Sequence, residues 1–145
     1  MKGAALIDRL HDERCSCVIA QGDAVRTFTR RGVADLYGLL HDEPAFLKGA
    51  CVADKVIGKA AAAILVKAGV AEVYADVISR PARELLEQAG VQVTWASEAD
   101  HIINRSRTGW CPLETLCLPE TDVDRMLLLI TRFLQTNAGR VSSGA

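Results

Sequence analysis

Charged side chains gather at the start of the most apolar stretch of the chain, ACVADKVIGKAAAAILVKAG (50–69). Read as a helix that begins near Asp54, the stretch makes Asp54 an N-cap whose carboxylate accepts backbone N–H groups. Lys55 and Lys59 would then share a helix face, and both could converge on an anion held at the helix start. The sequence therefore predicts an anion site with Asp54, Lys55 and Lys59. The alternative is that Asp54 only caps the helix and both lysines reach solvent.

A second group of reactive side chains lies in NRSRTGWCPLE (104–114). Asn104 and Arg105 supply donors suited to a carboxylate or phosphate, within a segment whose Gly and Pro residues predict a shaped loop. Cys111 and Glu114 are three residues apart, which would place a nucleophile beside a base if the backbone turns there. The alternative is a packed thiol and a surface carboxylate.

Asp76 is a further candidate for ligand binding, because a carboxylate within the apolar run VYADVI must be paired or lie near an open end of a sheet.

The chain also carries five cysteines, an odd number that favours reduced thiols over a disulfide framework. Cys15 and Cys17 are two apart in a strand-like run, so we expect them on one side of a sheet and most simply in the core.

The elements that must position these residues alternate along the chain. A short helix (4–11) precedes two strand-like runs joined at Gln21-Gly22-Asp23, which predict a β-hairpin. A short helix (35–40) follows. After the helix that ends at Gly69 come a strand (EVYADVIS), a helix started by Ser79 and Pro81, and a second strand (VQVTWAS), the order of a parallel crossover unit. TLCL predicts a short strand, and a helix is expected from Asp122 to Gln135.

Length and charge limit the classes of protein. The 145 residues suit one domain, taken as 1–138 with a frayed tail at 139–145. A net charge of −1 with interspersed signs predicts no general nucleic-acid binding. Asp8 and Arg9 break the N-terminal apolar run too soon for a signal peptide, and Lys67 interrupts the run after Lys59 before it could span a bilayer, so we expect a cytoplasmic protein. The second strand of the hairpin could pair at a sheet edge in a homodimer.

Three segments in order, ADKVIGKAAA (53–62), YADVIS (74–79) and IINRSRTGWCPLE (102–114), closely resemble domain-of-unknown-function family 1893, a small bacterial family. The resemblance covers about residues 15 to 120. It implies a cytidine-deaminase-like fold, a three-layer α/β/α arrangement with a mixed sheet of about five strands. This agrees with the hairpin followed by a crossover.

The residues that a zinc deaminase needs are missing. Such enzymes use a His or Cys ligand with Glu two residues on, then Pro-Cys-x-x-Cys. Here Ala53 follows Cys51 at the Glu position, and after Pro81 the residues Ala82 and Leu85 replace both cysteines. Cys51, Cys111 and Cys117 could form a different metal site, but their spacing matches no standard pattern. We therefore expect no metal and no cofactor.

Two functions stay open on these observations. The first is a metal-independent enzyme acting on a small anionic or nucleotide-like molecule, by group transfer or hydrolysis. In it Cys111 is the nucleophile or proton donor and Glu114 or Asp54 is the base, while Asn104 and Arg105 orient the substrate. The second is a non-catalytic binding or sensor module built on the same scaffold. Whether the protein is an enzyme is not decided by the sequence.

Overall fold

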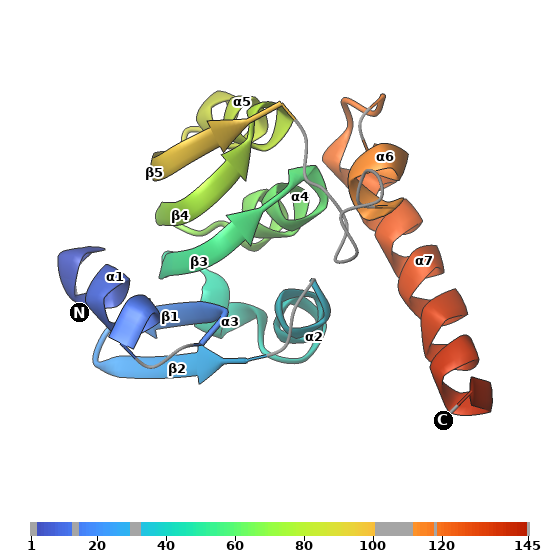
Figure 1. Cartoon of the computed structure of the whole chain (residues 1–145), viewed down its shortest axis with the longest axis horizontal. Coiled ribbons are helices and arrows are strands. Elements are labelled where there is room, and N and C mark those ends of the chain that lie inside the picture. Colours follow the sequence, from blue (N-terminus) through green and yellow to red (C-terminus); the bar gives the residue numbers. More distant parts are fainter. Residues whose placement is uncertain (1–2, 13–14, 30–32, 101–111, 118, 145) are drawn as a thin grey trace.

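A five-stranded mixed sheet forms the centre of the computed structural model, which describes residues 3–12, 15–29, 33–100, 112–117 and 119–144. The strands stand in the order β2-β1-β3-β4-β5; β1 is antiparallel to β2 and β3, and β3, β4 and β5 run parallel. Their bounds are β1 Cys17–Gln21, β2 Ala24–Phe28, β3 Cys51–Ile57, β4 Glu72–Ser79 and β5 Gln92–Ala99. This confirms a mixed α/β fold with an N-terminal hairpin and crossover connections (Figure 1).

Helices cover the two faces of the sheet unequally (Figure 1). One face packs against the large hydrophobic core formed with α2 and with the helices that follow it, and the other carries a small cluster beneath α1. On β5 the side chains of Gln92, Thr94 and Ala96 are exposed. The helix α1 therefore leaves part of this second face of the sheet uncovered. The helices are α1 Gly3–Asp12, α2 Ala34–Asp42, α3 Pro44–Leu47, α4 Lys59–Ala68, α5 Arg80–Gln88, α6 Pro112–Cys117 and α7 Val123–Gly144.

The stretch 50–69 is a strand followed by a helix, so the prediction of one helix beginning near Asp54 is wrong. β3 ends at Ile57, Gly58 is the N-cap of α4 in an extended conformation (φ −97°, ψ 179°), and Lys59 is the first helical residue. β3 lies between β1 and β4, and apolar residues on both of its faces are buried. A strand buried on both faces loses the alternation that distinguishes it from a helix. Asp54 is therefore not a helix cap.

Of the elements after α4, the helices α5 and α7 agree with the sequence-based predictions, whereas the strand predicted at TLCL does not form. Ser79 caps α5 by accepting the backbone N–H of Ala82 at 3.3 Å, and Gly90 ends that helix with φ +81°. TLCL is not a strand: it overlaps α6, whose Cys117 is buried in the large core. The last helix begins as predicted and continues well beyond Gln135, to Gly144.

Cys15 and Cys17 are both buried, but on opposite faces of the sheet. Cys17 belongs to the large core, whereas Cys15 packs under α1 with Leu6 and Leu10. The expectation that they share a side is wrong because β1 begins only at Cys17, so the alternation of a strand does not extend back to Cys15. Their role as core residues is confirmed.

Gly69 ends α4 in the left-handed region (φ +76°), where its N–H bonds to Leu65 O and Val66 O at 3.1 Å. We expect Gly69→Ala to destabilise the protein by about 1 kcal/mol through backbone strain, because a Cβ would meet only Lys48 Cγ at 3.9 Å. Gly38→Ala, inside α2 with open space around it, is the matched control and should stabilise by up to about 1 kcal/mol. Urea unfolding of both variants measures the difference in free energy of unfolding. Equal effects at the two sites would contradict the left-handed conformation assigned to Gly69.

Within the described ranges, no helix is both long enough and apolar enough to cross a membrane.

Candidate functional site

Neighbouring residues of β3 point to opposite faces of the sheet, which divides the predicted site in two. Asp54 lies opposite Cys17 of β1 and Ala75 of β4, two residues of the large core, so its side chain faces the helical layer. Lys55 follows it and faces the α1 side. The structure therefore does not bring Asp54 and Lys55 together as the helical interpretation requires.

Asp54 is a partly buried carboxyl group in the middle of β3, at the last residue of that strand that pairs with β1. Its Oδ1 accepts the backbone N–H of Val56 at 3.2 Å, and its carboxyl also bonds to the thiol of Cys17. Burial raises the pKa of Asp54 to about 7, an effect that outweighs these hydrogen bonds and to which the negative charge of Asp76 adds. Asp54 can therefore both give and take a proton near neutral pH.

The thiol of Cys17, beside Asp54, is not activated as a nucleophile. Burial raises the pKa of Cys17 well above its ordinary value, and the neighbouring carboxyl of Asp54 raises it further. A thiol is nucleophilic as the thiolate. Cys17 therefore serves as a buried neighbour that shields Asp54 from water, and it does not act as a nucleophile.

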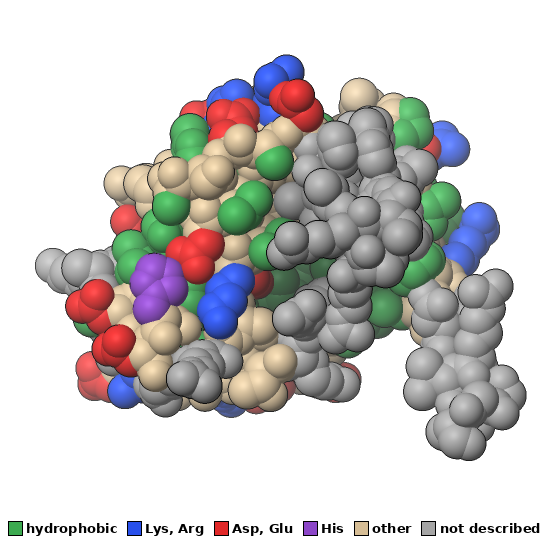
Figure 2. Space-filling view, in the orientation of Figure 1, with side chains coloured by type: hydrophobic (Ala, Val, Ile, Leu, Met, Phe, Trp, Pro, Cys, Tyr) green, Lys and Arg blue, Asp and Glu red, His purple; other side chains and the backbone are tan. Residues whose placement is uncertain are grey.

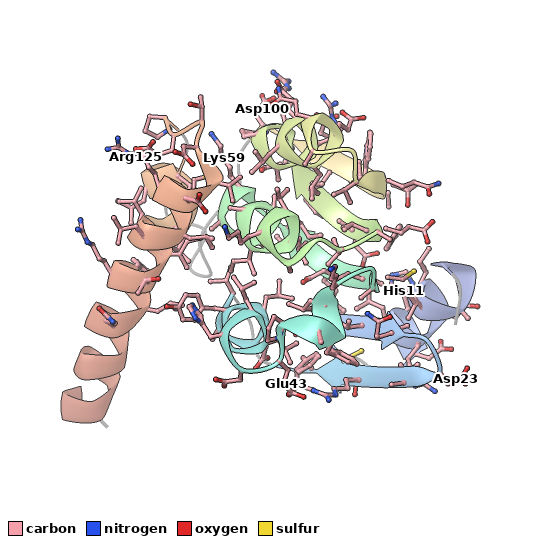
Figure 3. All side chains as sticks on the ribbon, turned by 180° about the vertical axis from the view of Figure 1, so that it is seen from behind. His11, Asp23, Glu43, Lys59, Asp100 and Arg125 are labelled. Atoms are coloured by element: carbon pink, nitrogen blue, oxygen red, sulfur yellow. The ribbon has the colours of Figure 1, made fainter. Side chains whose placement is uncertain are left out.

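The ammonium group of Lys59 has a partner within the protein. Although it is the first residue of α4, its side chain is buried, and its ammonium group donates to the backbone oxygen of Glu120 at 2.6 Å. Figure 3 shows Lys59 where α4 meets the start of α7. This contact ties α4 to the segment before α7, a role that competes with the predicted binding of an anion.

Asp76 lies on the α1 side of β4 and is paired there, as the sequence requires. Its Oδ1 accepts a hydrogen bond from the hydroxyl of Tyr74 at 2.7 Å and lies 2.8 Å from Nε2 of His11, at the end of α1. Burial first, and then Asp76, raise the pKa of Tyr74 to about 12, so its hydroxyl stays protonated and donates. Figure 2 shows histidine, acidic and basic side chains together on this face.

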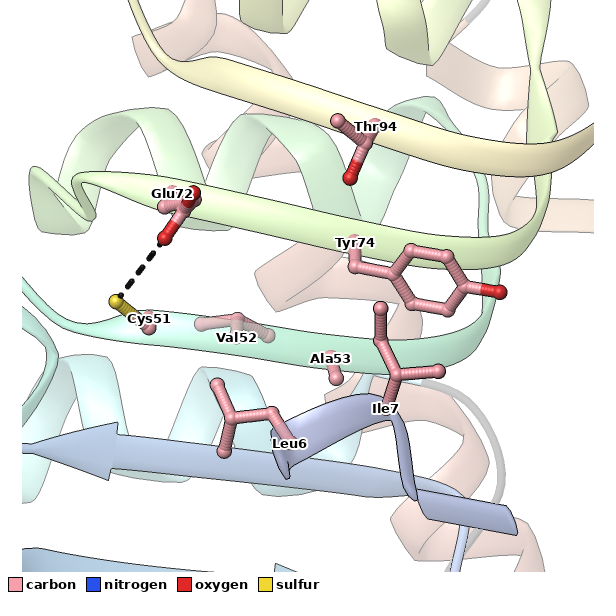
Figure 4. Close-up of a pocket in the computed structure, with 8 residues that line it drawn as sticks. All are labelled: Leu6, Ile7, Cys51, Val52, Ala53, Glu72, Tyr74 and Thr94. Atoms are coloured by element: carbon pink, nitrogen blue, oxygen red, sulfur yellow. Dashed lines mark hydrogen bonds between the residues drawn. The ribbon is translucent and has the colours of Figure 1, made fainter. Parts of the chain in front are cut away.

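A small depression opens nearer the amino ends of β3 and β4, beneath α1 (Figure 4). Its walls include Leu6, Ala53, Tyr74 and Thr94, and the thiol of Cys51 bonds to the carboxylate of Glu72 at 3.5 Å. The cavity volume of about 30 Å³ holds roughly one water molecule, far below the several hundred Å³ of a ligand pocket. We assign it to packing between α1 and the sheet.

The remaining predicted residues are not placed. Asn104, Arg105 and Cys111 lie outside the described residues, and Glu114 belongs to α6 but its side chain is not described. Over the parts of the chain that are described, no three His, Cys, Asp or Glu side chains stand close enough to hold a metal ion.

Three residues that the sequence did not single out as site residues contact the predicted carboxylates. Cys17 bonds to Asp54, and His11 and Tyr74 contact Asp76. Tyr74 had a signal, since it stands two residues before Asp76 in a strand and so shares its face. His11 had none, because a helix 65 residues earlier in the chain brings it to Asp76.

The described geometry defines an α/β protein with titratable side chains within two adjacent parallel strands, on both faces of the sheet. The family model for a domain of unknown function (DUF1893) matches residues 5–134, and the chain therefore belongs to this family. The crystal structure of a DUF1893 family protein, TM1506 from Thermotoga maritima, is similar at a TM-score of 0.82 and 23% identity over 89% of this chain and 87% of that chain. This likeness supports the fold alone.

A weaker similarity is to RibD from Acinetobacter baumannii, with a TM-score of 0.42 and 20% identity over 56% of this chain and 28% of that chain. A likeness at this level carries no argument about fold or activity. No curated protein sequence matches the chain.

Proposed function

We propose that this protein binds a small anionic or nucleotide-like molecule at the carboxyl ends of β3 and β4 and transfers protons there without a catalytic zinc ion. Asp54 is the acid–base group of this proposal. The observation that carries it is a partly buried carboxyl with a pKa of about 7, on a central strand whose carboxyl end lies at the side of the sheet where open α/β proteins bind ligands.

The starts of the two crossover helices support a reaction without zinc. We propose a cytidine-deaminase-like arrangement, in which zinc ligands would come from the first turns of α4 and α5. Those turns are Lys59-Ala60-Ala61 and Arg80-Pro81-Ala82, which contain no thiol, imidazole or carboxylate. Cys51 lies at the opposite, amino end of β3, away from both turns. The residues present do not fit the usual zinc site.

The roles of the other predicted residues follow from this placement. Backbone N–H groups in the first turn of α4 lie beyond Gly58 and can receive an anionic group, aided by the helix dipole. Cys111 as nucleophile or proton donor, Glu114 as an additional base, and Asn104 and Arg105 as orienting donors remain part of the proposal. The cytoplasmic location and a homodimer paired through β2 likewise remain predictions from the sequence.

The alternative function is a non-catalytic sensor that binds the same kind of molecule. The arrangement of Lys59 favours it in one respect, because the ammonium group of Lys59 bonds to the backbone of Glu120 and so links α4 to the segment before α7. In this alternative Asp54 would make ligand affinity depend on pH without performing a reaction.

The test uses cytidine and cytidine 5′-monophosphate as probes for the native protein and for Asp54→Asn. We expect amide NMR signals of residues 54–62 to shift saturably with at least one probe in the native protein. Affinity should change about tenfold between pH 6 and pH 8, because Asp54 titrates in that interval. Asp54→Asn should bind with no such pH dependence.

The same samples separate the enzyme from the sensor. Product formation followed by NMR, abolished by Cys111→Ser while probe binding is retained, would support the enzyme. Binding without any product would support the sensor. If no probe shifts the signals of residues 54–62, or if the pH dependence persists in Asp54→Asn, the assignment of Asp54 is wrong.

A further inference from the structure

We propose a second anion-binding site on the α1 side of the sheet, in which His11 and Lys55 bind a phosphate or carboxylate group and Asp76 and Tyr74 position them. This site lies on the face opposite to the side chain of Asp54, and it does not depend on the function proposed for Asp54.

Asp76 holds the imidazole of His11 in a defined orientation. Oδ1 of Asp76 contacts both Nε2 of His11 and the hydroxyl of Tyr74, at 2.8 and 2.7 Å. A carboxylate on one ring nitrogen fixes the tautomer of a histidine and leaves the other nitrogen to bind or protonate a ligand. Nδ1 of His11 is that other nitrogen, and with 48% of the His11 side chain exposed the ring is open to solvent.

Lys55 is placed beside Asp76 by the register of β3 and β4. Asp54 pairs with Ala75 and Val56 pairs with Val77, so Lys55 and Asp76 stand next to each other in the parallel ladder. Among the described residues, Lys55 has no side-chain hydrogen bond or ion pair within 4.0 Å. Its ammonium group is therefore available on the same face as His11.

An interruption in both strands exposes this position. In β3, Val52 and Ile57 face the large core although they are an odd number of residues apart. The same holds for Ala75 and Ile78 in β4. The regular alternation of side chains between the two faces is therefore shifted by one residue in both strands, at neighbouring positions. Two consecutive residues in each strand, Lys55-Val56 and Asp76-Val77, consequently stay out of the core. Val56 is 47% exposed. Such irregularities in strands commonly re-aim side chains next to functional sites.

The local chemistry favours an anion over a cation. Lys55 and His11 can both donate to an anion, and the carboxylate of Asp76 already accepts two hydrogen bonds through a single oxygen. A lone phosphate or carboxylate group could be bound by the lysine ammonium and by Nδ1 of His11. The depression lined by Leu6 and Thr94 is too small to bury a larger ligand body, so the anionic group itself is the recognised part.

The experiment titrates the native protein with inorganic phosphate and, separately, with acetate at about pH 6, where a histidine side chain can carry a proton. Imidazole NMR signals of His11 report binding. We expect a saturable shift with at least one anion and an affinity at least tenfold lower in Lys55→Gln. Saturation by phosphate alone would identify a phosphate ligand, and saturation by both would identify a general carboxylate or phosphate site.

Two variants provide matched controls. Lys67→Gln removes a lysine that pairs with Asp124 elsewhere on the surface, and His41→Gln removes a histidine whose ring packs at a tilt against Tyr37. Neither should change the affinity, whereas Tyr74→Phe should weaken it by severalfold because Asp76 loses one of its two donors. The side chain of Lys55 is only partly buried, so Lys55→Gln is expected to fold.

The result that would overturn the proposal is the absence of a saturable His11 shift with either anion, or a shift that Lys55→Gln leaves unchanged. Asp54→Asn distinguishes this proposal from the preceding one. It should retain anion binding at His11, whether or not the nucleotide probes bind at the ends of β3 and β4.

Discussion

Asp54→Asn is expected to be more stable than the native protein at pH 8 and to lose a decline in stability that the native protein shows as the pH rises from about 4 to about 7. The pKa of Asp54 is about 7 in the folded chain, against 3.8 for an ordinary aspartate. Between these values the folded chain keeps a proton that the unfolded chain has released. Stability therefore falls with rising pH through this interval.

The size of the effect follows from the shift of about three pKa units. It corresponds to at most about 4 kcal/mol, reduced by solvent screening because Asp54 is only partly buried, so we expect about 2 kcal/mol at pH 8. Asparagine resembles the protonated carboxyl, keeps an acceptor for the N–H of Val56 and does not titrate. At pH 4 the two proteins should therefore have similar free energies of unfolding.

Chemical denaturation between pH 4 and pH 8 measures this difference. Asp124→Asn is the matched control, because Asp124 is an exposed carboxylate that pairs with Lys67 at 2.9 Å, and such surface pairs contribute about 1 kcal/mol or less. A native pH dependence that persists in Asp54→Asn would show that another group causes it.

Leu65→Ala is expected to destabilise the protein by about 2–5 kcal/mol at any pH. Leu65 is fully buried in α4, which lies between the sheet and α7, so truncation leaves a cavity that neighbouring elements cannot readily close. A loss of this size is a large fraction of the stability of a domain of this length.

Leu128→Ala in α7 is the control for this variant. Leu128 is 51% exposed, and its truncation should change the free energy of unfolding by less than about 0.5 kcal/mol. Urea denaturation compares the two. A cost below about 1 kcal/mol for Leu65→Ala would contradict the placement of α4 at the centre of the core.

The parts of the fold that the sequence predicts correctly are those with a strong local signal. Gly22 and the flanking runs predict the hairpin, and Ser79 with Pro81 predicts the start of α5. The boundary between β3 and α4 had no such signal. An alanine-rich run follows a strand that is apolar on both faces, and Gly58 alone separates them.

That one boundary changed the interpretation of the candidate site. Placed on a helix, Asp54 and Lys55 would lie near each other at its N-terminus; placed on a strand, they face opposite sides of the sheet. Asp76 was correctly expected to be paired, because a carboxylate within a buried strand needs a donor. Its partner His11 could not be predicted, since the contact depends on how α1 packs across β1 and β3.

Asp54, in the middle of β3, is expected to titrate near neutral pH. The most direct measurement is the ¹³C NMR signal of its side-chain carboxyl, followed from pH 3 to pH 9 and assigned by its absence in Asp54→Asn. We expect a midpoint of about 7. A midpoint near 4 would mean that Asp54 is an ordinary ionised carboxylate at neutral pH, and it would contradict both the acid–base role and the expected pH dependence of stability.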